Sequence, residues 1–487
     1  MISFKGTHFP KDVILVLSLC LLSVVTPPVQ AAVDYTVTRS CPNDFSSITF
    51  ISAPSAGMYS EKEKQLTNHL LDACTALVTV TSTVHRHGWD YSDTTLTKSI
   101  KYAESFNVPI LFIKVKEWGA VWQVIPIEPE LEITDSDGNL KTINPACAVD
   151  SITKDGDNPF YFLFQQGESD KLVIYFNGGG ACWSDDTCVS HPVYTSDIRE
   201  IPERNPSLGL FDDENVRNPF KKWSKVFIPY CTGDLHVGSS TQVYTDSDGT
   251  KVELKHHGFD NFLAVKQWIE SRFSKENSSD LKNMVVVGTS GGGYGATLNF
   301  PHLQDAFPNI KAALLADSSL FITDQDFIDL TFNNRGIWNL KNTLPTIFSE
   351  KLGNFTSCGF NTEIYTTLTG AYPDSRFAQF TSEYDSDLVY YLSIMLEGNS
   401  PDRCDSALSE DDKLKEYWKY RMESSLDSIA NTKDNYQFYI KSGNEHTILP
   451  INSFYTEQSG GGIFFSDWLG RFADEKEFRQ ENLKYSN

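Results

Sequence analysis

From about residue 147 onward, the pattern of apolar and polar positions predicts strands and helices that alternate along the chain. Short runs rich in β-branched and aromatic residues predict strands, at Phe160–Gln165, Lys171–Phe176, Lys225–Pro229, Asn283–Val287, Ala312–Ala316, Arg376–Phe380 and Tyr436–Lys441. Helices are predicted over Phe259–Phe273, where apolar residues recur at helical spacing, over the charged stretch Asp411–Ser424 and from near Phe464. This alternation predicts an α/β fold, a mostly parallel sheet with helices on both faces.

Residues 33 to about 145 have a different pattern and predict a small N-terminal α/β region of unknown role, ahead of the larger domain at 147–487. The pattern favours helices over Glu61–Ala76 and around Thr97–Ser105. It favours strands elsewhere, at Leu77–Val84, Val108–Lys116 and Val121–Ile127, with a closing turn at Asp135–Asn139.

The N-terminus has the composition of a signal peptide. A basic start with Lys5 and Lys11 precedes the apolar run Val13–Val25, and small residues around Ala31 and Ala32 follow. This order is typical of a cleaved leader, and the run is short for a membrane span. We therefore expect residues 1–31 to be removed, no membrane span after their removal, and a secreted or periplasmic protein.

Charge and cysteine content narrow the class of function. The net charge of −23 disfavours nucleic acid partners, whose phosphates repel an acidic surface. Eight cysteines remain once Cys20 leaves with the leader, and an even number in an exported protein favours disulfides. Cys182 and Cys188 are close enough in sequence to pair, whereas the other pairings stay open. Zinc is the alternative, but the chain has no C-x-x-C pair to support it.

A serine stands in a glycine-rich turn, in the run Gly288–Gly293 around Ser290. The predicted strand Asn283–Val287 precedes this turn, and Tyr294–Phe300 reads as the opening of a helix. A strand, a sharp G-x-S-x-G turn and a helix form the nucleophile elbow of α/β-hydrolases. Ser290 is therefore the candidate nucleophile, and the Gly291 N–H, at the start of the helix, is a candidate oxyanion donor.

A serine nucleophile needs a base and an acid from later in the chain. Only His302 and His446 follow Ser290, and His302 falls in or just beyond the elbow helix. His446 lies in a loop directly after the last predicted strand, and it is the candidate base. Asp385 and Asp317 each follow a predicted strand, and Asp387 is a weaker competitor for the acid. Spacing alone does not decide among them.

A second glycine-rich segment follows the predicted strand Lys171–Phe176, in the order Asn177-Gly178-Gly179-Gly180-Ala181-Cys182-Trp183. Backbone N–H groups of such a loop can approach a substrate oxygen without obstruction by side chains. Gly179 and Gly180 are the candidate partners of Gly291 in an oxyanion hole. A Cys182–Cys188 disulfide would hold this loop rigid. A phosphate-binding loop is disfavoured because no Lys-Ser/Thr pair follows.

Taken in order, these motifs resemble the pectin acetylesterase/Notum carboxylesterase family, and particularly its bacterial members. The resemblance covers roughly residues 147–480 and rests on Asn177–Trp183, Pro229–Asp234, His257-Gly258 with Asn261, the Ser290 elbow, Ala316–Ser318, Tyr384–Ser386 and Glu445-His446. It implies an α/β-hydrolase fold with Ser290, Asp385 and His446 as the triad, and it leaves Asp317 a structural role. In the Notum branch the third position of the oxyanion loop is Trp, whereas this chain has Gly180.

The resemblance implies a serine carboxylesterase that works through an acyl-enzyme, without a metal or other cofactor. Its expected substrate is an acylated carbohydrate, with acetyl groups on a polysaccharide such as pectin. The high negative charge would not steer the protein toward a polyanion, so a less charged glycan or another ester fits equally well. Two alternatives stay open: a Notum-like fatty-acyl deacylase, and a catalytically silent binding protein with a hydrolase fold.

Overall fold

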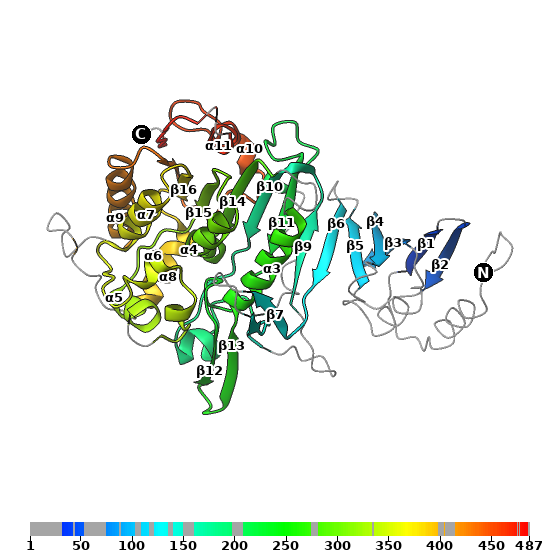
Figure 1. Cartoon of the computed structure of the whole chain (residues 1–487), viewed down its shortest axis with the longest axis horizontal. Coiled ribbons are helices and arrows are strands. Elements are labelled where there is room, and N and C mark those ends of the chain that lie inside the picture. The colour runs from blue at the N-terminus through cyan, green and yellow to red at the C-terminus, as the bar shows by residue number, and fades with distance from the viewer. Residues whose placement is uncertain are drawn as a thin grey trace. The chain divides into compact units, whose positions relative to one another are not determined.

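We describe the protein from a computed structural model of the chain (Figure 1). The described residues are 32–41, 44–52, 75–86, 89–102, 109–115, 121–134, 140–149, 160–196, 208–273, 281–333, 336–397, 404, 414–474, 476 and 478–485; side chains are described from residue 122 onward within these ranges, except at 168 and 169. The chain divides into two compact units, Met1–Pro126 with Leu163–Gln165, and Ile127–Phe162 with Gln166–Asn487.

The second unit is built on a parallel sheet in the strand order β17-β16-β15-β14-β10-β11. Its strands are β10 (Glu168–Phe176), β11 (Trp223–Ile228), β14 (Asn283–Thr289), β15 (Ala313–Asp317), β16 (Arg376–Ser382) and β17 (Tyr436–Lys441). Every residue of β11, β15 and β16 is buried, as expected for strands covered on both faces. The predicted α/β-hydrolase sheet is confirmed, and all six of its strands are among those predicted from the sequence.

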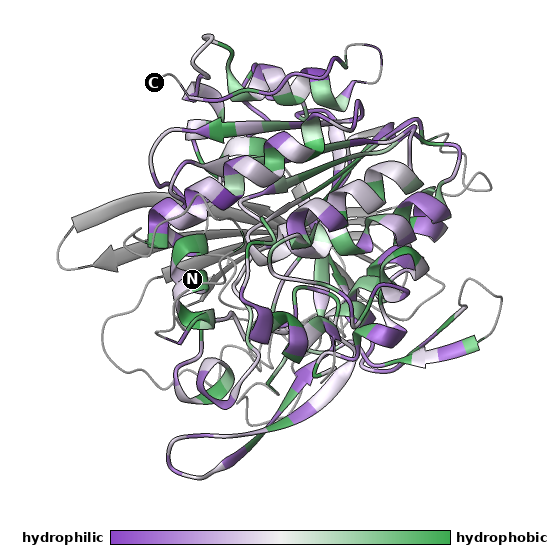
Figure 2. Ribbon diagram, turned by 90° about the vertical axis from the view of Figure 1, so that its left-hand side faces the viewer, coloured by the Kyte–Doolittle hydropathy of each residue, from purple (hydrophilic) through white to green (hydrophobic). Residues whose placement is uncertain are grey.

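Helices cover this sheet. In Figure 2 these helices contain both hydrophilic and hydrophobic residues. The longer ones are α3 (Gly258–Phe273), α4 (Gly291–Ala306), α7 (Phe360–Ala371), α8 (Ser386–Met395), α9 (Leu414–Ala430) and α11 (Phe465–Ala473). Short helices are α5 (Gln325–Ile328), α6 (Thr346–Ser349) and α10 (Ser453–Thr456). Helix α4 packs on β10, β14 and β15. The predicted helices at α3, α9 and α11 are confirmed, whereas α7 and α8 were not predicted.

Two antiparallel hairpins in this unit were also not predicted. One joins β7 (Leu131–Thr134) to β8 (Leu140–Ile143), and the other joins β12 (Ser240–Thr245) to β13 (Lys251–His256). The second hairpin projects from the lower side of the unit in Figure 1. The first hairpin packs Ile133 and Ile143 against Ala264 of α3. This hairpin belongs to the second compact unit, which begins at Ile127.

The first unit contains antiparallel strands in the order β2-β1-β3-β4-β5-β6. They are β1 (Ala32–Cys41), β2 (Asp44–Ser52), β3 (Thr75–Arg86), β4 (Trp89–Tyr102), β5 (Pro109–Val115) and β6 (Val121–Pro126). Strand β9 (Tyr161–Gln165) is divided between the two units. The predicted strands at β3, β5, β6 and β9 are confirmed.

The helix predicted around Thr97–Ser105 is wrong for residues 97–102, which form the end of β4. In the structure β3 and β5 pair with β4 on its two sides, and these ladder bonds outweigh a weak local helical pattern. Residues 61–74 of the predicted helix Glu61–Ala76 lie outside the described residues, and its last two residues belong to β3. The predicted signal peptide and the turn at 135–139 also lie outside the described residues.

Disulfides cross-link the second unit at Cys147–Cys231, Cys182–Cys188 and Cys358–Cys404. The predicted Cys182–Cys188 pair is therefore present. Persistent disulfides indicate an oxidising environment such as the outside of the cell. Within the described residues, every helix is too short or too polar to cross a bilayer.

Candidate active site

Ser290 lies at the sharp turn between β14 and α4, with φ 51° and ψ −128°. This is a strained conformation for a residue with a side chain. The neighbouring glycines make it possible, because a Cβ at Gly288 would lie 2.1 Å from the Gly292 carbonyl oxygen. A Cβ at Gly292 would lie 2.2 Å from the carbonyl oxygen of Phe176, at the end of β10. The predicted elbow therefore has the expected geometry, tight against the central strands.

His446 follows β17 and lies against the loop after β16. Its Nδ1 is 2.7 Å from Oδ1 of Asp385, which is fully buried. The same carboxylate oxygen accepts the backbone N–H groups of Asp387 and Leu388, at 3.2 and 3.1 Å, and so caps helix α8. Asp385 therefore performs two tasks at once, and the carboxylate orients the imidazole through its Nδ1–H.

The electrostatic surroundings of His446 favour its charged form. Burial works against the imidazolium, but the hydrogen bond to Asp385 and the charges of Asp385, Asp387 and Asp317 outweigh it and raise the pKa of His446. The Asp387 carboxylate lies 3.7 Å from Nε2, the ring nitrogen opposite the Asp385 contact, and its side chain is 54% exposed. A proton taken up at Nε2 is therefore stabilised by neighbouring negative charge.

The competing acid, Asp317, has different partners. Its Oδ2 accepts the backbone N–H groups of Ile448 and Leu449, both at 2.8 Å. Burial raises the pKa of Asp317 to about 7. The other rejected candidate, His302, is bonded through Nε2 to the Thr343 carbonyl oxygen at 3.1 Å. Of the three candidate acids, Asp385 is the one in contact with Nδ1 of His446, whereas Asp387 lies near Nε2 and Asp317 bonds to the backbone after His446.

The glycine-rich loop after β10 lies directly against the elbow. An added Cβ at Gly178 would approach the Ser290 Cβ to 2.9 Å, and one at Gly291 would approach the Gly180 carbonyl oxygen to 2.6 Å. Gly180 has φ 75°, and its Cβ would lie 2.1 Å from both the Tyr391 hydroxyl and the Val193 carbonyl oxygen. Tyr391, from α8, therefore occupies the space that a side chain at position 180 would need.

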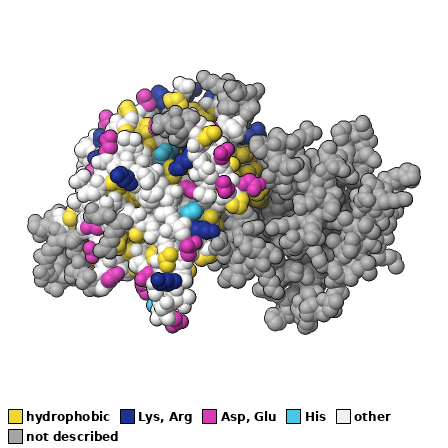
Figure 3. Space-filling view, turned by 60° about the horizontal axis from the view of Figure 1, so that its bottom comes forward, with side chains coloured by type: hydrophobic (Ala, Val, Ile, Leu, Met, Phe, Trp, Pro, Cys, Tyr) yellow, Lys and Arg dark blue, Asp and Glu magenta, His cyan; other side chains and the backbone are white. Residues whose placement is uncertain are grey.

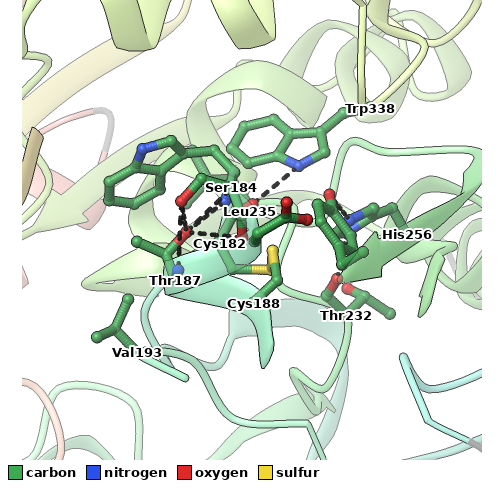
Figure 4. The surroundings of a disulfide bond; sticks show 12 residues. Cys182, Ser184, Thr187, Cys188, Val193, Thr232, Leu235, His256 and Trp338 are labelled. Atoms are coloured by element: carbon green, nitrogen blue, oxygen red, sulfur yellow. Dashed lines mark hydrogen bonds between the residues drawn. A yellow bond between two sulfur atoms is a disulfide. The ribbon is translucent and has the colours of Figure 1, made fainter. Parts of the chain in front are cut away.

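Further contacts fix this loop at both ends. At its start, the His236 Nε2 lies 2.9 Å from the Asn177 carbonyl oxygen, and burial lowers the pKa of His236 to about 4. At its end, the Cys182–Cys188 disulfide closes a short loop. The Trp338 indole donates to the Cys182 carbonyl oxygen at 3.2 Å. Figure 4 shows Trp338 and Thr187 beside this disulfide.

His256 lies beside this disulfide, with a ring nitrogen within 4.8 Å of both sulfur atoms, a spacing at which three groups can share a metal ion. The sulfurs are bonded to each other, however, and both ring nitrogens of His256 are in use. Its Nδ1 lies 2.8 Å from the Thr232 carbonyl oxygen, and its Nε2 lies 2.8 Å from the Tyr244 hydroxyl. This group therefore does not fit a zinc ion and serves as packing behind the glycine-rich loop.

A pocket opens beside Ser290 and is also lined by Gly180 and Gly291. Most of its other walls are apolar or aromatic, contributed by Leu235, Tyr294, Phe321, Phe327, Phe332, Leu388, Tyr391 and Met395. Of the residues predicted for the site, Gly179, Asp385 and His446 are not among those that line this pocket. The pocket can hold an apolar group attached to a carbonyl at Ser290.

Several residues around the site were not identified from the sequence. Ser319 donates through its hydroxyl to the Ser290 carbonyl oxygen at 2.7 Å, and Ser318 accepts the Thr447 N–H at 3.0 Å. Tyr391 and His236 contact the glycine-rich loop, as described above. The Ala316-Asp317-Ser318 motif marks the position of the serines, but no spacing rule connects Tyr391 or His236 to the loop.

Comparison with known proteins gives separate information on the class of protein. A family model described as Pectinacetylesterase matches residues 131–463. Among curated relatives, human palmitoleoyl-protein carboxylesterase NOTUM is 25% identical over 189 residues, which cover 36% of each chain. The mouse protein is 26% identical over 246 residues, 45% of this chain and 46% of its own. The chain thus spans less than half the length of these relatives.

Solved esterase structures are more distant. An esterase of Pyrococcus furiosus has a TM-score of 0.32 and 11% identity over 73% of this chain and 93% of its own. Carboxyl esterase 2 of Tuber melanosporum has a TM-score of 0.29 and 13% identity over 73% of this chain and 87% of its own. The family model covers most of the chain and confirms the resemblance seen in the motifs: the protein belongs to the pectinacetylesterase family.

Proposed function

We propose that the protein is a serine carboxylesterase in which Ser290, His446 and Asp385 form the catalytic triad. The observation that carries this proposal is the arrangement at one edge of the sheet. A strained Ser290 opens on an apolar pocket, and the Asp385–His446 pair follows strands β16 and β17 in the same sheet. Membership of an esterase family supports the same reaction class.

In this mechanism the neutral Nε2 of His446 takes the proton of the Ser290 hydroxyl as its oxygen attacks the ester carbonyl carbon. The tetrahedral oxyanion is bound by backbone N–H groups of Gly179, Gly180 and Gly291, each worth about 3 kcal/mol of barrier. The imidazolium then protonates the departing alcohol, which leaves Ser290 acylated. Water, deprotonated by His446, hydrolyses the acyl-enzyme and restores the free serine.

Asp385 contributes by holding one tautomer of His446 and by stabilising the imidazolium. Its Oδ1 has three donors, the imidazole and two backbone N–H groups, which keep the carboxylate in place. The raised pKa of His446 makes it a stronger base than free imidazole, which assists proton removal from Ser290.

The acyl group of the substrate would enter the apolar pocket beside Ser290. An acetyl ester on a carbohydrate such as pectin is the first candidate, in line with the family. The aromatic walls of the pocket support a second candidate, a longer acyl chain of the kind named for the NOTUM relatives. In Figure 3 the described acidic and basic side chains lie intermixed, and this face offers no continuous basic surface for a polyanionic glycan.

Its site of action would be outside the cytoplasm. The signal-like segment around Val13–Val25 and the disulfides of the second unit together support a secreted or periplasmic protein.

The test is hydrolysis of p-nitrophenyl esters from acetate to palmitate by the mature protein and by its Ser290→Ala variant. Turnover that depends on Ser290 and is greatest on acetate supports glycan deacetylation. A maximum at longer chains supports deacylation of a lipid-modified substrate. If no ester gives turnover that depends on Ser290, the esterase proposal is wrong and a binding protein with a hydrolase fold takes its place.

A further inference from the structure

The segment that ends β15, Asp317-Ser318-Ser319, contacts both halves of the proposed catalytic machinery. All three residues are fully buried. Strand β15 lies between β14, which leads to Ser290, and β16, which leads to Asp385. The segment is therefore placed to set the distance between the nucleophile and the base.

Toward the nucleophile, the contacts hold the backbone of Ser290 on both sides. The Ser290 N–H donates to the Asp317 carbonyl oxygen at 2.8 Å. The Ser319 hydroxyl lies 2.7 Å from the Ser290 carbonyl oxygen and 2.9 Å from that of Asp317. These bonds connect the strained turn to the neighbouring strand.

Toward the base, the contacts hold the three residues that directly follow His446. The Thr447 N–H donates to the Ser318 hydroxyl at 3.0 Å. The N–H groups of Ile448 and Leu449 both donate to Oδ2 of Asp317 at 2.8 Å. A single carboxylate oxygen thus holds two consecutive backbone groups of the histidine loop.

Backbone strain accompanies these contacts. Ser318 has φ 53° and Thr447 has φ 64°, values that residues with side chains seldom adopt. Such conformations persist where the surrounding bonds enforce them, and they gather at functional sites. Both strained residues belong to the same hydrogen bond, which joins β15 to the histidine loop.

The burial of Asp317 is costly for a residue with only a structural role. Its Oδ1 has no hydrogen-bond partner among the described residues. A buried carboxyl group with an unsatisfied oxygen lowers stability, and an apolar side chain would pack at this strand end at less cost. Local costs of this kind are expected at active sites, where the required geometry competes with stability.

We propose that Asp317 is a positioning residue: its carboxylate holds the loop that carries His446 at a fixed distance from Ser290. The proposal rests on the esterase function proposed above. Asp317 does not touch the substrate or the reacting atoms. It acts through Ile448 and Leu449, and a displacement of the loop by about 1 Å would lower the rate roughly 100-fold.

The experiment compares Asp317→Asn with Asp317→Ala on the p-nitrophenyl ester that the wild-type protein hydrolyses best. The Asn side-chain oxygen can still accept both backbone N–H groups, whereas Ala removes the acceptor. We expect kcat of Asp317→Ala to fall roughly 100-fold with KM within about twofold, and we expect Asp317→Asn to retain most of the kcat. Asn435→Ala is the control, since it removes three hydrogen bonds to carbonyl oxygens in and just after α7 and lowers stability without contacting the site.

Hydrogen exchange measured by mass spectrometry on peptides that span Ile448 and Leu449 completes the test. We expect faster exchange in Asp317→Ala and wild-type exchange in Asp317→Asn. Wild-type kcat in Asp317→Ala, or equal losses of kcat in the two variants, would overturn the proposal. Absence of Ser290-dependent turnover in the wild-type protein would refute the esterase function instead, and unchanged exchange in Asp317→Ala would then still refute the tether.

Discussion

The Asp385 carboxylate both accepts from Nδ1 of His446, at 2.7 Å, and caps the first turn of helix α8. Because α8 also contributes Leu388, Tyr391 and Met395 to the pocket, the capping bond ties the pocket wall to the imidazole. Orientation of the base and the shape of the acyl site therefore depend on the same side chain.

Because Asp385 has this double role, its substitution by Asn and its substitution by Ala should have different effects. Asp385→Asn keeps an oxygen for the cap but loses the negative charge opposite His446, and we expect kcat to fall by about 10³- to 10⁴-fold with little change in thermal stability. Asp385→Ala should lose the same activity and also about 1 kcal/mol of stability through the missing cap. Steady-state kinetics and thermal unfolding measure the two effects. Activity of either variant near that of wild type would contradict the assignment of the acid.

The pH dependence of kcat/KM follows from the raised pKa of His446. The base acts in its neutral form, so activity should fall as the pH drops through a pKa above the ordinary value of about 6.5. Asp387 contributes to this shift, since its carboxylate lies 3.7 Å from Nε2.

Asp387→Asn removes that negative charge and should move the acid limb of the profile to lower pH. Because the Asp387 side chain is exposed, the shift of the acid limb should be small. The matched control is Asp467→Asn, a half-exposed carboxylate paired with Arg217 outside the site. An acid limb that is unchanged in Asp387→Asn, or that moves to higher pH, would show that this carboxylate does not act on the base.

Gly180 should not tolerate a side chain. In Gly180→Ala the new Cβ would meet the Tyr391 hydroxyl and the Val193 carbonyl oxygen, and displacement of the loop should lower kcat by about 100-fold or more. Gly353→Ala is the control for backbone strain, because Gly353 also has a positive φ, 86°, with open space around its Cβ position. We expect only a modest loss of stability in the control. Equal kinetics in the two variants would argue against a role for Gly180 in oxyanion binding.

The Cys182–Cys188 and Cys358–Cys404 disulfides should differ in their effect on catalysis. Replacement of Cys182 and Cys188 by Ala is expected to cost about 2 kcal/mol of stability and to lower kcat, because the glycine-rich loop loses its tether. Replacement of Cys358 and Cys404, which close a longer loop, should cost about 4 kcal/mol and leave kcat unchanged. Measurement of kcat well below the unfolding temperature of each variant separates the effect on catalysis from the effect on stability. A loss of kcat in the second pair, but not in the first, would contradict the tethering role.

The central sheet could be predicted because its strands are short runs of β-branched residues, which are stable only when both faces of the strand are buried. Val285 and Val286 of β14, for example, pair with Val173 and Ile174 of β10 in the buried middle of the sheet. The elbow could also be predicted, since a side chain at Gly288 or Gly292 would clash with a nearby backbone carbonyl oxygen and glycine is therefore required there. Features that are determined by the local sequence could therefore be predicted from it.

Other features depend on partners far along the chain and could not be predicted. The strand at Thr97–Tyr102 forms because β3 and β5 flank it, although its local pattern favours a helix. Asp317 bonds to Ile448 and Leu449, which lie more than 130 residues away along the chain. The local sequence pattern around Asp317 indicates only the end of a strand. Tyr391 takes the space above Gly180 through tertiary packing, which no spacing rule describes.

The most direct test of the account is the reaction of the protein with a fluorophosphonate, followed by peptide mass spectrometry. We predict one adduct, on Ser290, that forms much more slowly in His446→Ala and not at all in Ser290→Ala. A stable fold in both variants, shown by thermal unfolding, is the control. Labelling of a different residue, or labelling of Ser290 at the same rate without His446, would contradict the proposal that these two residues act together in ester hydrolysis.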